Sequence, residues 1–393
     1  MTVSHPGLTI PAARNLTSYE VDALAGPFNL SDGHPRQRPT PGQAKVIASI
    51  PAMFDEARLR SFEDIENEAH ERFFGALGQA RAPIGTGRIL SCYASSVAMD
   101  IVARALSART RQVALLHPTF DNIPDLLRAW GHVLLPVSQE AFDACSPEVF
   151  AADPGCVFVT TPNNPTGWVL TRDSLAWLAG ECARRGVVLV LDTCFRGFDR
   201  RAWFDTYQVL TDSGVDWVVI EDSGKLWPVA EFKAGFLAFS DSDLPLRDAF
   251  SDLLLTMSPV ILAVVGLLAQ DAAAGGFGQM HEMIAVNRSA IRAGLGEAGL
   301  AGPPDPHSQV CVERILLPDG LASSAAYDLL CERGLHVLPC DPFHWNAPAE
   351  GANFIRVSLG RDRDLLRTAA GQLATAIALA ARPARLTSRA GRP

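Results

Sequence analysis

Residues 156–167 read CVFVTTPNNPTG, an unbroken apolar run that gives way to threonine, proline, asparagine and glycine. Similar apolar runs occur at VALLHP (113–118), VVLVLD (187–192), WVVIED (217–222) and GFLAFS (235–240). Helical patterns at 122–131 and 174–186 separate several of these runs. Strands that are apolar along their whole length are covered on both faces, which is typical of a mainly parallel sheet. The sequence therefore predicts an α/β fold.

Four of the apolar runs end in polar residues that can carry chemistry, namely HPTFD, TTPNNPTG, DTCFRG and EDSGK. The carboxyl ends of parallel strands lie at one edge of a sheet, and ligands of such proteins bind there. A single charged strand end can simply reach solvent, so one loop alone would indicate little. Because all four loops fall at the same edge, we expect them to form one site.

Composition narrows the class of protein. The chain has 393 residues, 48% of them hydrophobic, and a formal net charge of −9, which argues against nucleic acid or an anionic membrane as the main partner. Its eight cysteines contain no CxxC pair, so we expect no metal site and no disulfide framework. The N-terminus lacks a signal-peptide pattern, and the longest apolar stretch, Pro259 to Ala269, has about half the length of a membrane span. A cytoplasmic protein is expected.

The sequence divides into four segments. Residues 1–45 are rich in Pro, Gly, Asn and Asp, with a short helical patch near Ser18–Leu24, and we expect an arm that covers the active site. Residues 46–285 are expected to form a large domain, and 286–380 a smaller C-terminal α/β domain. Residues 381–393 are basic and rich in Pro and Gly, which predicts a disordered tail.

The polar loops offer groups that suit one cofactor. Asp192 ends a buried strand and can keep a ring nitrogen protonated, and Lys225 can form an imine with an aldehyde. The helix that opens with Ser95 and Ser96 offers hydroxyls, backbone N–H groups and a positive dipole end to a phosphate.

Two further residues complete this set of groups. Phe120 can lie flat over an aromatic ring, and Asn164 can donate a hydrogen bond to a ring oxygen. An aldehyde, a pyridine nitrogen, a ring oxygen and a phosphate together describe pyridoxal 5′-phosphate (PLP). The sequence therefore predicts a PLP site at the sheet edge.

The order of these motifs resembles the fold-type-I PLP enzymes of the aminotransferase class I/II kind. The motifs are ASS (94–96), HPTF (117–120), NNPTG (163–167), DTCF (192–195), SGK (223–225) and FIRVSLGR (354–361). The resemblance implies a large domain with a mainly parallel seven-stranded sheet and a smaller C-terminal α/β domain. It also implies that Lys225 forms the Schiff base, that Asp192 contacts the pyridine nitrogen, and that Arg356 binds the substrate carboxylate. Taken alone, Arg356 would be a surface charge beside a strand.

Three positions depart from the aminotransferase pattern. Phe195 stands where a tyrosine usually donates to the ring oxygen, and Lys233 stands where an arginine usually binds the phosphate. Asp222 replaces a serine that usually contacts the phosphate, and a carboxylate beside a phosphate is repelled. We therefore expect Asp222 to face a cation, either a substrate or an internal lysine or arginine.

Nearly the whole chain, departures included, resembles the oxygen- and PLP-dependent L-arginine oxidase/hydroxylases that feed enduracididine-type biosynthesis. The matching stretches are SDGHPRQ, LSCYASSVAMD, HPTFDNIPDLLR, VFVTTPNNPTG, LDTCFRGFD, VIEDSGKLWP and FHW. The resemblance implies that the arm folds over bound arginine and that His34 takes part in the oxidative steps. It implies that Glu20 and Asp222 contact the guanidinium. Taken alone, a loop histidine such as His34 is usually solvated.

The expected site residues fall into three groups. The expected catalytic residues are Lys225 and His34. The expected cofactor contacts are Ser95, Ser96, Phe120, Asn164, Asp192, Cys194, Lys225 and Lys233. The expected substrate contacts are Thr17, Glu20, Asp32, Asn164, Asp222 and Arg356.

The resemblance implies a reaction in which O2 is the co-substrate. L-Arginine would be oxidised to 4-hydroxy-2-oxoarginine, to 2-oxoarginine or to both, with release of ammonia and hydrogen peroxide. One alternative is an aminotransferase that acts on a basic amino acid. Another is a non-catalytic module that senses PLP or arginine, which the short arm and the acidic chain disfavour. A homodimer is expected, because sites in this fold family lie between subunits.

Overall fold

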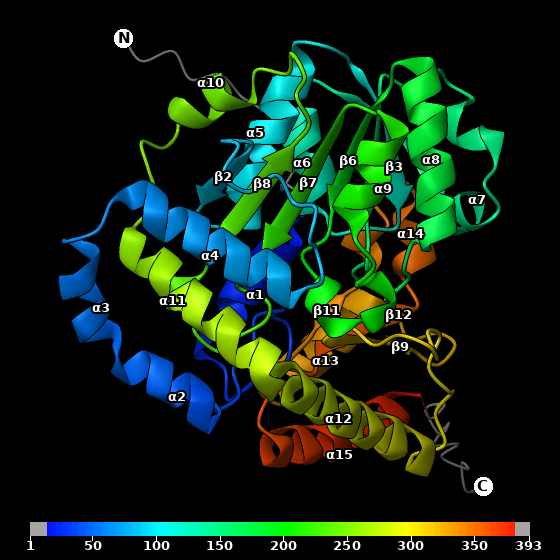
Figure 1. Cartoon of the computed structure of the whole chain (residues 1–393). Coiled ribbons are helices and arrows are strands. Elements are labelled where there is room, and N and C mark those ends of the chain that lie inside the picture. The colour runs from blue at the N-terminus through cyan, green and yellow to red at the C-terminus, as the bar shows by residue number, and fades with distance from the viewer. Residues whose placement is uncertain (1–13, 382–393) are drawn as a thin grey trace, which may run out of the picture.

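A computed structural model of the protein describes residues 14–381. A seven-stranded sheet forms its centre, with the strands in the order β2-β8-β7-β6-β5-β3-β4 (Figure 1). Every pairing in this sheet is parallel except those of β8 with β7 and with β2. The predicted α/β fold with a mainly parallel seven-stranded sheet is confirmed. The predicted tail lies outside the described residues, apart from its first residue.

The strands of the large sheet match the apolar runs of the sequence. They are β2 (Ile89–Cys92), β3 (Gln112–His117), β4 (Val133–Ser138), β5 (Cys156–Thr160), β6 (Val188–Asp192), β7 (Trp217–Asp222) and β8 (Gly235–Phe239). Every residue of β5, β6, β7 and β8 is buried. This burial explains why their sequences are apolar throughout instead of alternating. Because β8 runs antiparallel, its first residue and not its last lies at the edge that carries the polar loops.

Helices cover the sheet and connect its strands. They are α4 (Phe62–Ala76), α5 (Ser95–Ser107), α6 (Asn122–Ala129), α7 (Gln139–Asp143), α8 (Arg172–Arg185), α9 (Thr206–Ser213), α10 (Leu246–Ser251) and α11 (Pro259–Asp271). Local signals fix their ends. In α8, the Thr171 side chain accepts a hydrogen bond from the Ser174 N–H, and Gly186 ends the helix in the left-handed conformation.

A smaller unit follows the large sheet along the chain. Its antiparallel sheet has the order β11-β12-β9, from β9 (Val312–Leu316), β11 (Leu338–Pro339) and β12 (Phe354–Ser358). Its helices are α12 (Phe277–Glu297), α13 (Ser323–Cys331), α14 (Pro348–Gly351) and α15 (Arg363–Ala380). The predicted domain boundary at residues 285 and 286 falls inside α12, which packs against α15.

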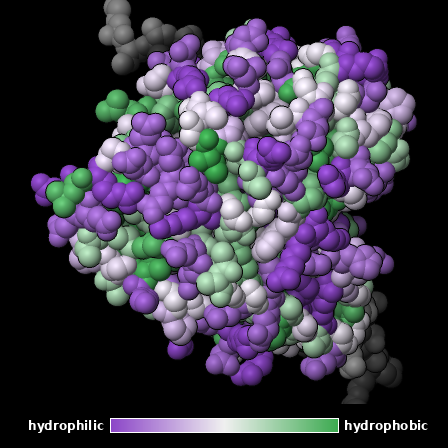
Figure 2. Space-filling view, viewed as in Figure 1, coloured by the Kyte–Doolittle hydropathy of each residue, from purple (hydrophilic) through white to green (hydrophobic). Residues whose placement is uncertain are grey.

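One helical run, Pro259–Glu297, is long and apolar enough by length and composition to cross a membrane. The core helix of a soluble protein passes the same test, and 44% of the apolar window is buried here. The run is also interrupted, because Gly275 has a non-helical φ of 131° between α11 and α12. The α11 part packs against α4. In Figure 2, apolar side chains on the visible face lie scattered among polar ones. Core packing therefore explains the apolar character of α11.

The arm is packed against the rest of the protein. It contains α1 (Leu16–Asp22), β1 (Phe28–Asn29) and the start of α2 (Pro41–Ala48), and α3 (Ile50–Ala57) follows it. Strand β1 pairs in parallel with β10 (Leu335–His336), and α1 lies between the large sheet and the small unit (Figure 1). Leu16, Ala23 and Leu30 are fully buried. Apolar side chains therefore anchor the described part of the arm.

A carboxylate of the large domain holds the start of α1. The Leu16 N–H donates to Asp121 Oδ2 at 2.7 Å, while Asp121 Oδ1 is buried without a partner. Burial raises the pKa of Asp121 to about 7. An aspartate with a raised pKa favours the folded state below its unfolded pKa, near 4, and this contribution is lost as the pH rises through 7.

Asp121→Asn should therefore remove part of the pH dependence of stability. At pH 8 the unfolding temperature of the variant should exceed that of the wild type, and at pH 4 the two should be closer. Thermal scans at both pH values measure this, with the exposed Asp319→Asn as the control. A variant that is less stable than the wild type at pH 8 would show that Asp121 is needed in its charged form.

Candidate active site

The loops after β3, β5, β6 and β7 meet around one cavity, as the sequence predicted. It contains about 520 Å³ free of atoms, its open mouth included. The predicted residues that line it are Glu20, Ser95, Ser96, Phe120, Asn164, Asp192, Cys194, Lys225 and Arg356. Phe195 lines it too, and the arm contributes Gly33. The predicted residues Thr17, Asp32, His34, Asp222 and Lys233 are not in its lining.

Lys225 follows the end of β7 and is surrounded by acids. Burial alone lowers the pKa of Lys225, but the carboxylates of Asp222, Glu20 and Asp32 raise it above its usual value. The arm approaches the same lysine, because an ideal Cβ on Gly33 would lie 3.9 Å from Lys225 Nζ and 3.8 Å from Arg356 Nη1. A single stretch of arm backbone therefore lies against both cationic groups.

Asp192 ends β6, which is the parallel neighbour of β7. Burial raises the pKa of Asp192 to about 6, although a hydrogen bond from Cys194 counteracts this. The Cys194 N–H donates to Asp192 Oδ1 at 3.1 Å. A cation that faced Asp192 would lower its pKa again, so this buried carboxylate suits the protonated nitrogen of a ring.

The N-terminus of α5 offers an anion site beside the start of β8. An ideal Cβ on Gly235 would lie 2.6 Å from the Ala94 carbonyl carbon and 2.8 Å from Ser95 N, so a larger residue would displace the helix end. No side chain caps α5. The Ser96 hydroxyl lies in the cavity wall and accepts a hydrogen bond from Asn122 at 2.9 Å. The start of the helix and the Ser96 hydroxyl fit a phosphate.

Asp222 lies at this same helix end. Its Oδ2 accepts hydrogen bonds from the Ser95 hydroxyl at 2.6 Å and from Ser95 N at 3.4 Å, and its Oδ1 accepts one from Gly224 N at 2.6 Å. Within residues 14–381 Asp222 makes no ion pair, although its charge raises the pKa of the buried Lys225. Its expected contact with a cationic substrate stays a prediction. Lys233 packs nearby, since an ideal Cβ on Gly224 would lie 2.9 Å from Lys233 Cβ.

Arg356 lies on β12 and is fully buried, at 0% exposure. Among residues 14–381, none of its three guanidinium nitrogens has a hydrogen-bond partner, and Glu20 Oε1 lies 3.8 Å from Arg356 Nη2. The Phe343 ring packs at 5.8 Å from its Cζ. A buried guanidinium with this many free donors is costly unless an anion binds it. The structure therefore excludes the surface-charge interpretation of Arg356 and fits a carboxylate-binding role.

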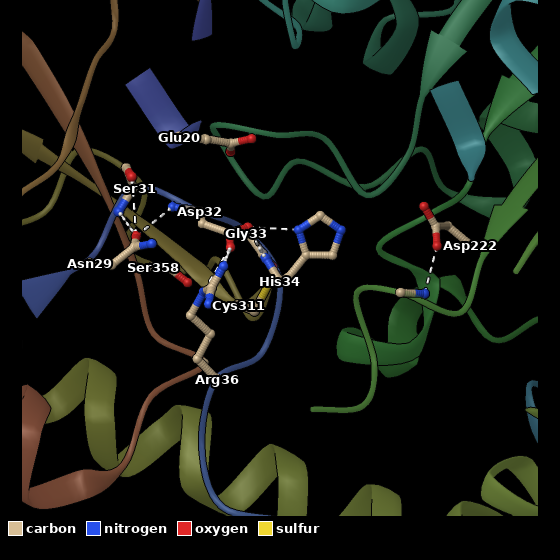
Figure 3. Close-up of polar contacts among 12 residues, drawn as sticks. Glu20, Asn29, Ser31, Asp32, Gly33, His34, Arg36, Asp222, Cys311 and Ser358 are labelled. Carbon is tan, nitrogen blue, oxygen red and sulfur yellow. Dashed lines mark hydrogen bonds and ion pairs between the residues drawn. The ribbon is translucent and has the colours of Figure 1, made fainter. Parts of the chain in front are cut away.

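Asp32 and His34 form a pair on the arm (Figure 3). Asp32 Oδ1 accepts from His34 N at 2.8 Å and lies 2.7 Å from His34 Nδ1. Its Oδ2 accepts from Arg36 Nε at 2.8 Å and from Arg36 Nη2 at 2.6 Å. All four acceptor positions of this carboxylate are then occupied, so Asp32 orients His34 and has no position free for a substrate. His34 is half-buried, which differs from a solvated loop histidine.

Arg361, which the sequence analysis did not single out, holds this part of the arm. Its guanidinium donates to the carbonyl oxygens of Asn29 at 2.5 Å, Asp32 at 2.7 Å and His34 at 2.9 Å. It also donates to the Ser358 hydroxyl at 3.1 Å, and it is 2% exposed. A planar fork with five donors suits this task. The only sequence signal was a second arginine at the end of FIRVSLGR.

Arg361→Lys should loosen residues 29–36, because an ammonium cannot reach three carbonyls at once. Losing charged hydrogen bonds of about 1.5–3 kcal/mol each predicts trypsin cleavage after Arg36 at least about tenfold faster than in the wild type. Limited proteolysis with mass analysis measures the rate. The exposed Arg367→Lys is the control, and equal cleavage rates in both variants would remove Arg361 from this role.

Comparison with known proteins identifies the family. The family model of class I and II aminotransferases matches residues 55–373. The chain belongs to the class I and II aminotransferases. Within this family, it is 25% identical over 308 residues to a histidinol-phosphate aminotransferase of Caulobacter vibrioides, covering 76% of this chain and 75% of that protein. The large sheet and its edge site are therefore those of a PLP-dependent, aminotransferase-like enzyme.

Two further relatives concern guanidino compounds. A solved structure of MppP soaked with the product 2-ketoarginine is 45% identical, with a TM-score of 0.87, covering 89% of this chain and 99% of that one. A transaminase of 5-guanidino-3-methyl-2-oxopentanoate from Pseudomonas syringae is 24% identical over 270 residues, covering 67% of each protein. By contrast, the aspartate aminotransferase of Thermus thermophilus, at 17% identity and a TM-score of 0.74, shows the fold alone.

The residues of this aminotransferase-like site fit PLP. Lys225, Asp192, the start of α5 and Phe120 line one cavity, where they could hold the aldehyde, the ring nitrogen, the phosphate and the ring face. Asn164 also lines the cavity, and its side-chain oxygen is buried without a partner among residues 14–381. Phe195 places a carbon edge where a tyrosine hydroxyl would stand. Thr17 is exposed on α1 and lies outside the cavity.

Proposed function

We propose that this enzyme oxidises L-arginine with O2 to 2-oxoarginine, to 4-hydroxy-2-oxoarginine or to both. The observation that carries the proposal is the 45% identity to MppP, which was solved with 2-ketoarginine. Oxidation to 2-oxoarginine consumes one O2 and one water and releases one ammonia and one hydrogen peroxide. The hydroxylated product consumes a second O2 and a second water and releases a second hydrogen peroxide.

The charges around the cavity support arginine as the substrate. The free donors of Arg356 can bind the substrate carboxylate in a bidentate manner. Glu20, now 3.8 Å from Arg356, is then available to the substrate guanidinium. Arginine brings an anion for Arg356 and a cation for Glu20, so each buried group keeps a partner of opposite charge.

Two bases of the chain can move the protons that this reaction requires. PLP, when bound, supplies the electron sink that makes the Cα proton of an amino acid removable. Lys225 Nζ can take that proton when it is present as the neutral amine. His34 can act on a water that attacks Cγ, because Asp32 engages Nδ1 and leaves Nε2 free. The charge of Lys225, followed by burial, lowers the pKa of His34, so this imidazole is neutral and able to accept a proton at neutral pH.

The decisive experiment follows oxygen without an amino-group acceptor. Purified enzyme with PLP and L-arginine, but no 2-oxo acid, should consume O2 and release ammonia in an oxygen electrode. Mass spectrometry then identifies the keto-acid products. No oxygen uptake, together with turnover once a 2-oxo acid is added, would overturn the proposal. That result would establish the alternative, an aminotransferase of a basic amino acid, which the Pseudomonas syringae relative favours.

His34→Ala should change the products more than the binding of arginine. The variant should retain PLP and still oxidise arginine, because Lys225 and Arg356 are untouched. The ratio of 4-hydroxy-2-oxoarginine to 2-oxoarginine should fall at least about a hundredfold, within the range that general-base catalysis contributes. Product analysis by mass spectrometry measures this ratio. His336→Ala, a change at another histidine, serves as the control, and an unchanged ratio in His34→Ala would remove His34 from the mechanism.

A further inference from the structure

Three side chains with metal-ligating atoms converge where the end of β3 meets the small unit. His117 ends β3 of the large sheet, while His344 follows the short turn Asp341–Phe343 and Glu350 lies in α14 of the small unit. One ligand atom from each lies within 4.8 Å of the other two. His117 and Glu350 are 233 positions apart in the chain, so no spacing in the sequence pointed to this cluster.

The separations suit a tetrahedral ion. Glu350 Oε2 lies 3.3 Å from His117 Nε2 and 3.6 Å from His344 Nδ1. Zinc holds nitrogen and oxygen ligands at about 2.0–2.2 Å, and tetrahedral angles then place the ligand atoms about 3.3 Å from one another. Two of the three separations already agree with this value. Glu350 is 64% exposed and can adjust its position, so an ion can enter from solvent.

The nitrogens of His344 need a partner. His344 is 6% exposed, yet within the described part of the chain neither of its ring nitrogens makes a hydrogen bond, and Nδ1 of His117 is also buried without one there. Buried polar side-chain atoms are usually hydrogen-bonded, and an unsatisfied one is unfavourable. An ion bound to His344 Nδ1 would satisfy one of these atoms.

The surrounding packing brings the three ligands together. Gly351 permits the close approach of α14, because an ideal Cβ there would lie 2.8 Å from His344 Cδ2 and 2.4 Å from the Cys340 carbonyl oxygen. The Thr119 N–H donates to the Phe343 carbonyl at 3.1 Å. The Trp345 indole donates to the Leu116 carbonyl at 3.1 Å. These two hydrogen bonds hold the segment that contains His344 against the end of β3.

We propose that His117, His344 and Glu350 bind one divalent transition-metal ion of the zinc class, which joins the large sheet to the small unit. Two imidazoles and one carboxylate are a ligand set that zinc uses, with a fourth position left for water. The ring nitrogens that would not bind the ion, His117 Nδ1 and His344 Nε2, lack hydrogen-bond partners within residues 14–381. Loss of such partners lowers metal affinity by roughly 10–100-fold. The site should therefore bind zinc in the micromolar range and not as a permanent structural ion.

The test uses the full-length, PLP-loaded enzyme, freed of metal by a chelator and titrated with zinc chloride alone in the presence of a zinc indicator. We expect one zinc per chain with micromolar affinity. Glu350→Gln, at an exposed position, and His344→Ala should each weaken binding roughly tenfold or more. His307→Ala, which changes an exposed histidine elsewhere, should not. Cobalt in place of zinc should give the visible absorption of a four-coordinate site in the wild type and in His307→Ala, but not in His344→Ala.

Two results would overturn the proposal. Absence of saturable zinc binding in the micromolar range would reduce the cluster to hydrogen bonds between histidines and a glutamate. Binding of equal strength in the wild type and in Glu350→Gln would place the ion elsewhere. Because neither zinc binding nor the cobalt spectrum depends on arginine turnover, both readouts are independent of the proposed oxidase activity.

Discussion

Lys225→Ala should yield a protein that no longer attaches PLP covalently and has no measurable turnover of arginine. Lys225 is the lysine that lines the cavity, beside the end of β6 where Asp192 would face the ring. Borohydride reduction followed by peptide mass spectrometry measures the attachment. In the wild type the cofactor mass should appear on the peptide that contains Lys225, and in the variant it should be absent from the whole chain.

The matched control for this experiment is Lys233→Ala. Lys233 packs against Gly224, one residue before Lys225, so it is the obvious substitute amine. The Lys233→Ala enzyme should still carry the cofactor on Lys225, with weaker retention because the phosphate loses a nearby positive charge. Cofactor found on Lys233 in the Lys225→Ala enzyme would contradict the assignment of the reactive lysine.

Arg356→Met should weaken the use of arginine without lowering the stability of the protein. Methionine fills a similar volume and removes a buried guanidinium whose nitrogens have no hydrogen-bond partner. Replacing a poorly compensated buried charge with an apolar side chain is often neutral or stabilising by about 1–4 kcal/mol. The same change removes the carboxylate clamp, so kcat/KM for arginine should fall at least about a hundredfold, consistent with the loss of two charged hydrogen bonds. Chemical denaturation and steady-state kinetics measure the two effects.

Arg288→Met provides the opposite case. Arg288 is also buried, but its guanidinium is bonded to Glu313 and to the Val310 carbonyl. Removing the guanidinium leaves the Glu313 carboxylate and the Val310 carbonyl without their donor. Breaking such a buried pair lowers the free energy of unfolding by about 3 kcal/mol or more. Arg288→Met should therefore be less stable than the wild type. If Arg356→Met is destabilised to the same extent, Arg356 has a structural partner and its role as a waiting carboxylate clamp is wrong.

The large domain was predictable from sequence because its signals are local. The apolar runs at 113–118, 156–162, 187–192 and 217–222 are strands, and they end in polar loops at one edge. Parallel topology then forces those loops together, whatever lies between them along the chain. Lys225 and Asp192 follow from this geometry alone.

The arm and the small unit were harder to predict from the sequence, because their contacts join residues that are distant along the chain. Asp32 looked like a substrate ligand, yet Arg36 and His34 fill its acceptor positions. A charged group holds this part of the arm in place. That group is Arg361, an arginine of the protein itself, 329 positions from Asp32. Contacts between residues so far apart leave no periodic pattern in the sequence from which they could be predicted.

The pairing of the arm with the last strand of the small unit has a consequence for the order of synthesis. Asn29 leaves the ribosome long before Arg361, which follows it by 332 positions. At about 5–20 residues per second, the arm waits roughly 20–70 s for the side chain that holds its backbone. During that interval the large sheet can form, but the cavity lacks the wall that contains Gly33. The nascent enzyme thus acquires a cofactor pocket first and a complete substrate pocket only after Arg361, which precedes the last helix, α15, has emerged.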